Sequence, residues 1–315
     1  MIKKFCLLLV AILQSLYSFH DAELMELWAS IEDITHPTIE EFKRIEQYLK
    51  EGRRVYLDPL AYHDRYPRIR SLKLIGDNGE MPIFEKYSFN INEESDNRCI
   101  VLFGSYNGIY PQKTRNLLAE IGRCGYSGHV LMRIGGFPNL EDAGLKICHV
   151  PYAFKIASLL EAQRLGYDEI LWLDVAMHPL TNLETIFTAI KKRGFFFTNV
   201  GFLSDNMSTH LPKAAAALGI TTAQYGNIPH ISSSMIGLNM KNPRAVQLLK
   251  NWHTEAENVY PNITCWPEEL SLSVIAWRLQ CNPYCWFGNC VCGEHELDLP
   301  IVRQRPLQFY IDPIR

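Results

Sequence analysis

Asp174 is the acidic residue of this sequence whose position most suggests chemistry. It directly follows the apolar run EILWL (169–173), so one carboxylate is expected at the end of a buried strand. Capping a helix is the ordinary use of such an acid. Thr181 and Glu184, however, already form a capping box for a helix expected over residues 182–192, and Asp174 lies too early to cap it. An oxygen ligand at this place suits a divalent cation or a ribose hydroxyl.

Lys155 and two glutamates are the next candidates. Lys155 lies on a helix expected over residues 152–165 and could meet a phosphate, with a solvated helix lysine as the alternative. Lys155 and Ser158 are expected on a different face of this helix from its buried side chains. The side chains expected to be buried are Phe154, Ile156, Leu159, Leu160 and Leu165. Glu268 and Glu269 begin a helix, where they either act in catalysis or complement the helix dipole.

The loop GSYNG (104–108) follows the first expected strand of the main domain. Its glycines allow a ligand to approach the backbone closely, Tyr106 could stack on a base, and Ser105 lies beside it. The helix that follows favours anions at its N-terminus, and Arg115 and Arg133 are further candidate phosphate partners. The spacing matches no dinucleotide or phosphate-loop fingerprint, so an ordinary strand-to-helix turn is the alternative.

These residues need a scaffold, and the sequence from Cys99 onward predicts one. Short apolar runs typical of a buried parallel sheet alternate with helical segments. The runs are residues 99–103, 129–134, 169–173, 194–199 and 232–239. Helices are expected to begin at Pro111, Pro151, Pro243 and Pro267. Gly122 and Gly166 are expected to end two helices. The pattern predicts a doubly wound α/β domain, which binds ligands beyond the carboxyl ends of its strands.

The N-terminal part differs from this pattern. Residues 19–98 are expected to form a small α+β region, with an amphipathic helix that ends at Gly52 and an Asn78-Gly79 hairpin turn between two strand-like runs. Residues 90–97 are polar enough for a linker or surface loop. The main α/β domain with its cysteine-rich tail is expected over residues 99–315.

The first residues predict export. Lys3 and Lys4 precede a short apolar run followed by small residues, so residues 1–18 are expected to be a signal peptide, with an uncleaved membrane anchor as the alternative. The compartment is then periplasmic, secreted or the lumen of a secretory pathway. In a eukaryote, NMS (206–208) and NIT (262–264) would be glycosylation sequons.

Composition narrows the classes of partner. The chain of 315 residues is 47% hydrophobic and 21% charged, which suffices for one large domain or one domain with a smaller one. Its formal net charge of -3 gives no sign of the basic surface that nucleic-acid binding requires. We therefore expect no nucleic-acid partner.

The cysteines favour disulfides in an exported protein. Nine are present, and removal of Cys6 with the signal peptide leaves eight, an even number. The stretch 281–295 brings together Cys281, Cys285, Cys290, Cys292 and His295. Two disulfides or a tetrahedral zinc site would explain them, and export together with the unusual spacing favours the disulfides.

The central block YAFKIASLLEAQRLGYDEILWLDVAMHPLTNLETIF (152–187) resembles that of the GT-A-fold, nucleotide-sugar-dependent glycosyltransferases. Its order is a helix with a basic residue, an apolar strand that ends in an Asp motif, then a loop and a helix. Residues 230–256 and 266–277 resemble the acceptor-side strand and helix and the acidic segment of that family. The resemblance covers roughly residues 99–295. It implies a GT-A-like fold and transfer of a sugar from a nucleotide-diphosphate donor to a glycan or protein acceptor.

The resemblance also implies roles for the candidate residues. The family usually has Asp-x-Asp, which holds Mn²⁺ or Mg²⁺ across the diphosphate, whereas this chain has Asp174 without the second acid. Asp174 would lie at the diphosphate or its metal, and His178 or His295 would supply a further metal ligand. If no metal is bound, a basic residue such as Lys155 or an arginine would neutralise the diphosphate.

On the acceptor side, Glu269, ahead of Glu268, is the expected acid/base for the acceptor hydroxyl. Ser233, Ser234 and Asn239 could line the acceptor pocket, although ordinary strand positions explain them as well. Because the second Asp is absent, the alternative function is a secreted, catalytically inactive GT-A-like domain that binds carbohydrate or protein.

Overall fold

The computed structural model describes the parts of the chain on which the fold rests. These are residues 38–56, 72–138, 147–148, 150, 152–205, 212–258, 260–262, 264, 267–281, 283–285 and 302–304. The predicted signal peptide, the sequon at residues 206–208, Pro151, Cys290, Cys292 and His295 lie outside them. No helix in the described ranges is both long and apolar enough to cross a bilayer.

One mixed sheet forms the centre of the described chain, in the strand order β1-β3-β2-β4-β7-β6-β8. Its strands are β1 (Ile83–Phe89), β2 (Arg98–Gly104), β3 (Gly128–Ile134), β4 (Glu169–Leu173), β6 (Phe195–Phe202), β7 (Pro229–Asn239) and β8 (Tyr284–Cys285). Strand β2 is parallel to β3 and β4, and β6 is parallel to β8, whereas β1 and β7 run in the opposite direction. The predicted α/β class with a mostly parallel sheet is confirmed. A separate small sheet pairs β5 (Met177–Pro179) with β9 (Val302–Gln304).

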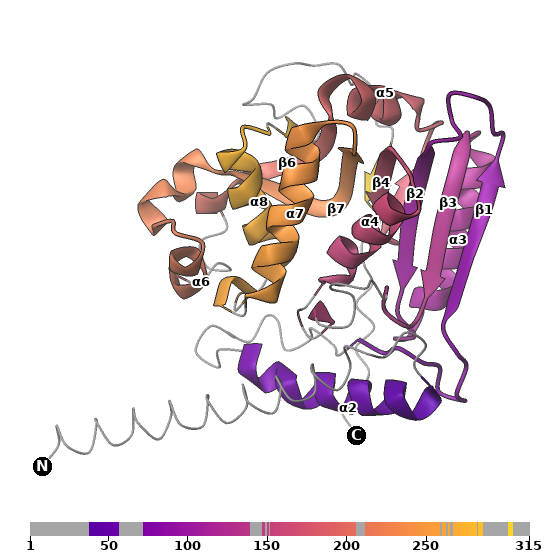
Figure 1. Cartoon of the computed structure of the whole chain (residues 1–315), viewed down its shortest axis with the longest axis horizontal. Helices are drawn as coiled ribbons and strands as arrows, with labels where there is room; N and C mark the ends of the chain where they lie inside the picture. Colours follow the sequence, from indigo (N-terminus) through magenta and orange to yellow (C-terminus); the bar gives the residue numbers. More distant parts are fainter. Residues whose placement is uncertain are drawn as a thin grey trace, which may run out of the picture.

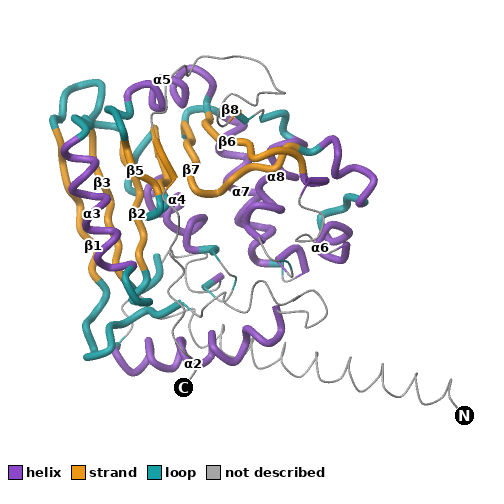
Figure 2. The backbone as a smooth tube through the Cα atoms, turned by 180° about the vertical axis from the view of Figure 1, so that it is seen from behind, coloured by secondary structure: helices purple, strands orange, loops and turns teal. Residues whose placement is uncertain are grey.

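Helices cover both faces of the main sheet. The helices at the front in Figure 1 are α4 (Phe154–Arg164), α7 (Pro243–Glu257) and α8 (Pro267–Arg278). The opposite face, seen in Figure 2, carries α3 (Tyr110–Arg123) and α5 (Glu184–Arg193). Beside the sheet lie α6 (Pro212–Ala217) and the 3-10 helices η3 (Thr222–Asn227) and η4 (Tyr260–Asn262). Because both faces are covered, β2 is buried at every position, as its continuous apolar run predicts.

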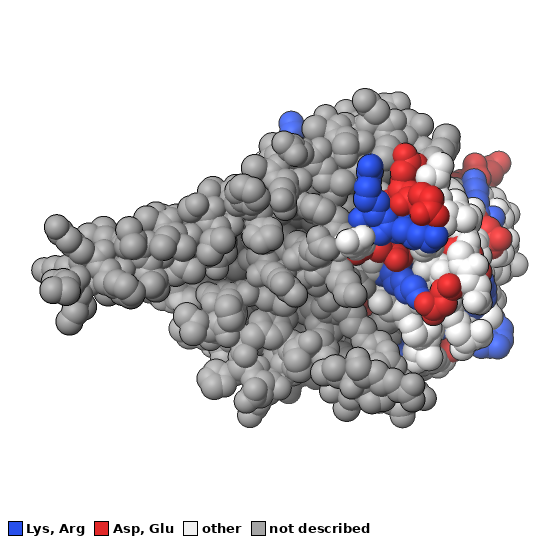
Figure 3. Space-filling view, turned by 90° about the horizontal axis from the view of Figure 1, so that it is seen from below, with Lys and Arg blue, Asp and Glu red and all other residues white. Residues whose placement is uncertain are grey.

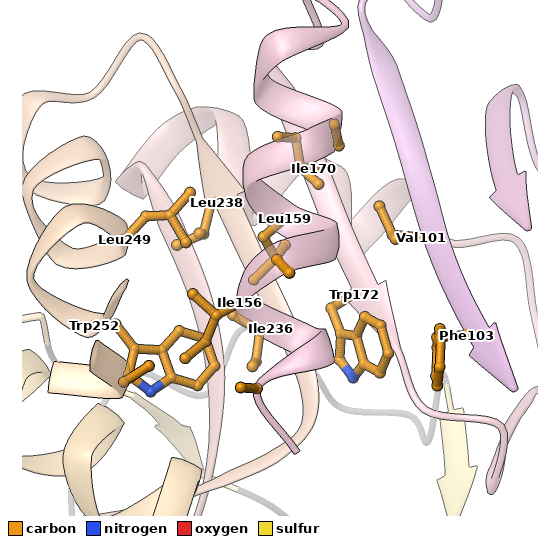
Figure 4. Close-up of a cluster of buried hydrophobic side chains, with 14 of the residues drawn as sticks. Val101, Phe103, Ile156, Leu159, Ile170, Trp172, Ile236, Leu238, Leu249 and Trp252 are labelled. Carbon is orange, nitrogen blue, oxygen red and sulfur yellow. The ribbon is translucent and has the colours of Figure 1, made fainter. Parts of the chain in front are cut away.

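The front layer encloses the larger hydrophobic cluster. Figure 4 shows side chains of β2, β4 and β7 facing those of α4 and α7, with Trp172 and Trp252 among them. Both indole side chains are almost fully buried, and burial of side chains of this size stabilises the fold by a few kcal/mol each. The cluster therefore fixes α4 against β4, the two elements that carry Lys155 and Asp174.

The N-terminal region shares this cluster. Helix α2 (Ile39–Tyr56) lies below the sheet in Figure 1 and contributes Phe42 and Ile45. Leu74 and Ile75 belong to the same cluster. Residues on both sides of the predicted boundary at 98/99 therefore pack in one core. The helix continues past its expected end at Gly52, because a helical glycine costs only about 1 kcal/mol relative to alanine.

The predicted hairpin is wrong, although its turn exists. Gly79 has the left-handed φ of 78° and donates its N–H to the carbonyl of Gly76. The strand after the turn, β1, pairs antiparallel with β3 at the edge of the main sheet and not with the residues before the turn. The long neighbouring edge of β3 offers β1 a full ladder of partners. Residues 90–97 form the surface turn expected of a linker.

Several helix ends differ from the expected ones. Proline lies in the first turn of α3, and α7 and α8 begin at Pro243 and Pro267 as predicted, whereas α4 begins at Phe154. Gly166, with a φ of 89°, follows α4 as expected. Gly122 lies inside α3, and Gly125 supplies the left-handed turn after that helix.

The predicted capping box of α5 is also wrong. The helix begins at Glu184, its N-cap is Leu183, and the Thr181 hydroxyl donates to the carbonyl of Asn182. The Glu184 carboxylate instead accepts two hydrogen bonds of 2.8 Å from the buried guanidinium of Arg98. A long-range charged partner therefore outcompetes the local cap.

The strand order reverses at β2. From β2 the chain crosses through α3 to β3 on one side, and α4 then leads back to β4 on the other side of β2. Ligands of such sheets bind outside the carboxyl ends of the strands at this reversal. The crossover helix α4 runs opposite to the strands that it connects, so its N-terminal turn, with Lys155, lies at the same edge as the end of β4.

Candidate functional site

Lys155 is the centre of a buried polar network at this edge. Its Nζ lies 2.6 Å from Ser233 Oγ on β7, 3.1 Å from Glu268 Oε1 on α8 and 3.9 Å from Asp174 Oδ2 after β4. Only 3% of the residue is exposed. Three parts of the chain that are distant in sequence from one another thus place polar side chains around the ammonium group of α4.

The burial of Lys155 corrects the expected helix face. Lys155 and Ser158 are both buried, because α4 packs against β2, β4 and α7, and the Lys155 side chain reaches Ser233 on β7 and Glu268 on α8. Leu165, expected in the core, is 54% exposed just past the last turn. Burial alone would lower the pKa of Lys155, but the charges of Glu268, Asp174 and Glu269 raise it above its ordinary value. The ammonium therefore stays charged inside the protein.

Asp174 uses its two carboxylate oxygens differently. Its N–H donates to the carbonyl of Ser234 at 2.9 Å, which extends the ladder between β4 and β7 by one residue. Oδ1 accepts a 3.0 Å hydrogen bond from the N–H of Ala176, and Oδ2 faces Lys155. The side chain is 27% exposed, the most accessible acid of the network. Asp174 thus stabilises its own turn with one oxygen and keeps the other at the edge of the sheet.

Glu268 and Glu269 bind the same serine. The Ser233 hydroxyl lies 2.9 Å from Glu268 Oε1 and 3.1 Å from Glu269 Oε1, and the N–H of Ser233 donates to Glu269 Oε1 at 3.0 Å. Glu269 Oε2 lies 3.0 Å from His230 Nε2 on β7, so this nitrogen carries the proton when Glu269 is ionised. Sequence reasoning missed His230, because nothing in the local pattern links a strand histidine to α8.

The two adjacent glutamates have opposite pKa shifts. Burial raises the pKa of Glu268, and the charge of Lys155 offsets this only in part. Burial alone would also raise the pKa of Glu269, but the hydrogen bond from His230, with the attraction of His230 and Lys155, holds it below its ordinary value. The side chain of Glu269 is 15% exposed and that of Glu268 only 3%. Glu269 is therefore the ionised carboxylate that faces outward.

The lowered pKa of Glu269 predicts how stability depends on acid. A carboxyl group whose pKa falls on folding stabilises the folded state above its unfolded value of 4.5 and loses this contribution as the pH falls through the lower folded value. Between about pH 5 and pH 3, the free energy of unfolding should fall more steeply in the wild type than in Glu269→Gln. Urea unfolding at a series of pH values measures both slopes. Parallel curves for the two proteins would contradict this assignment.

Tyr152 covers the ammonium from the N-terminal side of α4. Its ring centre lies 5.2 Å from Lys155 Nζ, a cation–π contact. Its φ of 65° is left-handed, which costs a residue with a side chain roughly 1–2 kcal/mol. Strain of this kind gathers at functional sites. No pattern in the sequence predicts this backbone conformation of Tyr152.

The predicted donor-side residues have other partners. Tyr106 donates its hydroxyl to the carbonyl of Met81 at 2.7 Å, and Ser105 is buried and accepts from the N–H of Asn107 at 3.4 Å. Arg115 is exposed on α3. Arg133 forms a 2.6 Å ion pair with Glu161 and lies over the ring of Phe84. The structure thus does not bring these four residues into the network around Lys155, and their predicted ligand contacts stay predictions.

The N-terminal region covers the loops after β2 and β3. The N–H of Tyr106 donates to the carbonyl of Lys73 at 2.9 Å, and the N–H of Gly136 donates to that of Leu74 at 2.7 Å. Glu46 on α2 accepts hydrogen bonds from the N–H groups of Leu74 and Ile75. Residues 73–75 therefore pack against the loops that follow β2 and β3, a role that sequence reasoning missed.

The surface below the sheet carries both signs of charge. In the described part of that face, Lys and Arg side chains alternate with Asp and Glu side chains (Figure 3). Helix α2, which lies on this side, contributes the 2.8 Å ion pair between Lys43 and Glu40. This part of the surface therefore offers mixed charge and not a field of one sign.

The described residues do not fit a metal centre. Among them, no group of three His, Cys, Asp or Glu side chains has the spacing of a metal site. His178, an expected ligand, lies 2.8 Å from Glu120 of α3 through Nδ1. The Lys155 ammonium already faces the free oxygen of Asp174. We therefore derive no step through Mn²⁺ or Mg²⁺.

Ser234 and Asn239, predicted for the acceptor pocket, have hydrogen-bond partners close to them in the chain. Ser234 pairs its hydroxyl with that of Ser232 at 2.8 Å, and Asn239 accepts from the N–H of Lys241, a turn contact. Asn262 of the second sequon is buried and donates to the carbonyls of Glu255 and Asn258, so it is not an accessible glycosylation site.

Cys281 differs from its expected role. It is a buried free thiol and forms no disulfide, and the same holds for Cys99 and Cys148. Cys124, which is partly buried, is also free. Burial raises the pKa of the Cys281 thiol to about 11. Of the other tail residues, only the backbone of Cys285 is described.

The fold and this site define an α/β protein with a buried, charged network at the carboxyl end of a central strand. No known protein family matches the sequence, and no curated protein matches it. Among solved structures, mouse xyloside xylosyltransferase 1 in its apo form is similar over 61% of this chain and 85% of its own, with a TM-score of 0.39 and 11% identity.

Proposed function

We propose that this chain is a glycosyltransferase that moves a sugar from a nucleotide-diphosphate donor to a glycan or protein acceptor. The observation that carries the proposal is the network of Lys155, Asp174, Ser233, Glu268 and Glu269. It lies where the strand order reverses, the place at which such sheets hold ligands. The resemblance of residues 152–187 to the GT-A-fold glycosyltransferases gives the same location for the donor.

Asp174 and Glu269, the two more exposed acids of the network, would have different roles. Asp174 is the most exposed carboxylate of the network and would contact the ribose or sugar hydroxyls of the donor. Glu269 is kept ionised, is partly exposed and would accept the proton of the acceptor hydroxyl. Lys155 and Glu268 are more deeply buried, and the contacts of Lys155 with Asp174 and of Glu268 Oε1 with Ser233 would hold both acids in position. The nucleoside diphosphate is the leaving group, and the positive charge of Lys155 would stabilise the negative charge that develops on it.

The test is a transfer and hydrolysis assay with a panel of nucleotide sugars. The purified full chain is incubated with UDP- and GDP-linked hexoses, pentoses and N-acetylhexosamines, and released nucleoside diphosphate is measured by chromatography. Parallel reactions with EDTA or with Mn²⁺ establish whether a metal takes part. We expect turnover of at least one donor by the wild type.

The alternative is a catalytically inactive domain that binds carbohydrate or protein. It is favoured by the missing second acid and by the engagement of Asp174 Oδ1 with the N–H of Ala176. Calorimetry with UDP, GDP and the nucleotide sugars separates the two functions. Absence of binding at millimolar concentration, with and without Mn²⁺, would overturn the transferase proposal and favour the inactive domain. Export through residues 1–18 is part of the proposal under either function.

A further inference from the structure

Two buried polar atoms beside the network have no hydrogen-bond partner among the described residues. They are the indole Nε1 of Trp172 and Oε2 of Glu268. Trp172 is 1% exposed and Glu268 is 3% exposed. An unpartnered buried donor or acceptor is costly and rare in folded proteins, and it calls for a physical explanation.

Trp172 lies on the side of β4 that faces the network. It precedes Asp174 by two residues, and the ladder with β7 continues through Asp174, so both side chains point to the α4 face. Its ring lies 5.7 Å from that of Phe154, the neighbour of Lys155. In Figure 4 the indole nitrogen lies at the lower end of the ring, which is also the end of the view where the strand with Val101 and Phe103 has its arrowhead. The N–H is thus directed to the edge where Asp174 lies.

Trp252 provides an internal comparison in the same hydrophobic cluster. It is as deeply buried as Trp172, but its Nε1 donates to Ser271 Oγ at 3.1 Å. This core therefore satisfies one buried indole N–H with a serine and leaves the other, beside the network, without such a partner. Packing alone accounts for the rings of both residues but not for this difference.

We propose that Trp172 Nε1 donates a hydrogen bond to an oxygen of the donor sugar, and that Glu268 Oε2 accepts one from a hydroxyl of the same sugar. A sugar offers both acceptor and donor oxygens, which matches the two unpartnered atoms. This inference rests on the proposed function, since it places the sugar of the nucleotide donor beside Asp174 and Lys155.

Entry of the sugar requires a covering side chain to move. Tyr152 is suited to this movement, because its ring lies against the Lys155 ammonium and its backbone is held in the left-handed region. Return of Tyr152 to an ordinary backbone conformation releases that strain and uncovers the network from the side of α4. Trp172 would then help to select the sugar.

The experiment compares Trp172→Phe with Trp252→Phe in the full chain. Both changes remove a similar volume and one indole N–H from the same core, so the cost of the cavity is common to them. Calorimetry with UDP or GDP and with the corresponding nucleotide sugar gives two dissociation constants for each protein. We expect Trp172→Phe to bind the nucleotide sugar about five- to tenfold more weakly and the nucleoside diphosphate unchanged. We expect Trp252→Phe to bind both ligands as the wild type does and to melt at a lower temperature than Trp172→Phe, because only it loses a hydrogen bond.

A second variant covers the case in which Trp172→Phe does not fold. Replacement of Trp172 by 3-benzothienylalanine exchanges the N–H for sulfur at nearly the same volume and should weaken the nucleotide sugar by the same factor. Unchanged binding of the nucleotide sugar by a folded variant would overturn the inference and leave the proposed function intact. An equal loss for both ligands would also overturn it, because the contact would then not be to the sugar. If the wild type binds neither ligand, the proposed function fails, and this inference fails with it.

Discussion

Lys155→Met is expected to lower the free energy of unfolding by about 3–5 kcal/mol, the cost typical of removing one partner from a buried ion pair. Methionine keeps the apolar stem of the lysine but leaves Glu268 and Ser233 without their cationic donor. Glu268 is almost completely buried and cannot recover its hydration in water. Urea unfolding near pH 7 measures the effect.

The double variant Lys155→Met, Glu268→Gln is the matched control. It removes the buried negative charge together with the positive one, so most of the lost stability should return. A single Lys155→Met variant as stable as the wild type would show that the ammonium is not paired in the folded protein. The network would then lose its central member, and with it the positions that we assign to Asp174 and Glu269.

Asp174→Ala is expected to reduce turnover of the nucleotide sugar by at least about 100-fold, while the melting temperature stays nearly unchanged. Its side chain is the most exposed acid of the network, with Oδ2 beside the Lys155 ammonium, and the hydrogen bond from Ala176 to Oδ1 contributes only about 1 kcal/mol to stability. The measurement is the transfer assay together with thermal unfolding.

Asp174→Asn serves as the control for the turn. The asparagine side chain can still accept the hydrogen bond from Ala176, but it carries no charge toward Lys155. Turnover should fall in both variants, and the small loss of stability should appear only with alanine. A large drop in melting temperature for Asp174→Ala with activity retained would assign this residue a structural role.

The local sequence patterns were sufficient to predict where several strands of the main domain lie. Continuous apolar runs correctly placed the strands at residues 99–103, 129–134 and 169–173, since these strands are covered on both faces. The runs could not reveal direction, and β7 lies antiparallel between β4 and β6. Direction depends on which neighbouring edge a strand joins, and this is a property of the whole sheet.

Predictions from neighbouring residues were wrong where a residue distant in sequence provided the partner. Glu184 was expected to cap its own helix, but it pairs with Arg98 from a strand 86 residues earlier. The segment before Asn78 was expected to pair with the one after it, whereas β1 joins β3. In each case a long-range contact takes the place of the expected local one, and sequence spacing alone does not rank the two.

By itself, the sequence determined the α/β class, the carboxylate at the end of β4 and the basic and acidic residues worth testing. Only the tertiary structure decided that Lys155 is buried between Asp174, Ser233 and Glu268, that His230 holds Glu269, and that the N-terminal region closes over the loops after β2 and β3. The physical reason is that periodicity records whether a side chain prefers water or the core. A charged side chain enters the core only when other elements supply its partners, and those partners come from positions that periodicity does not connect.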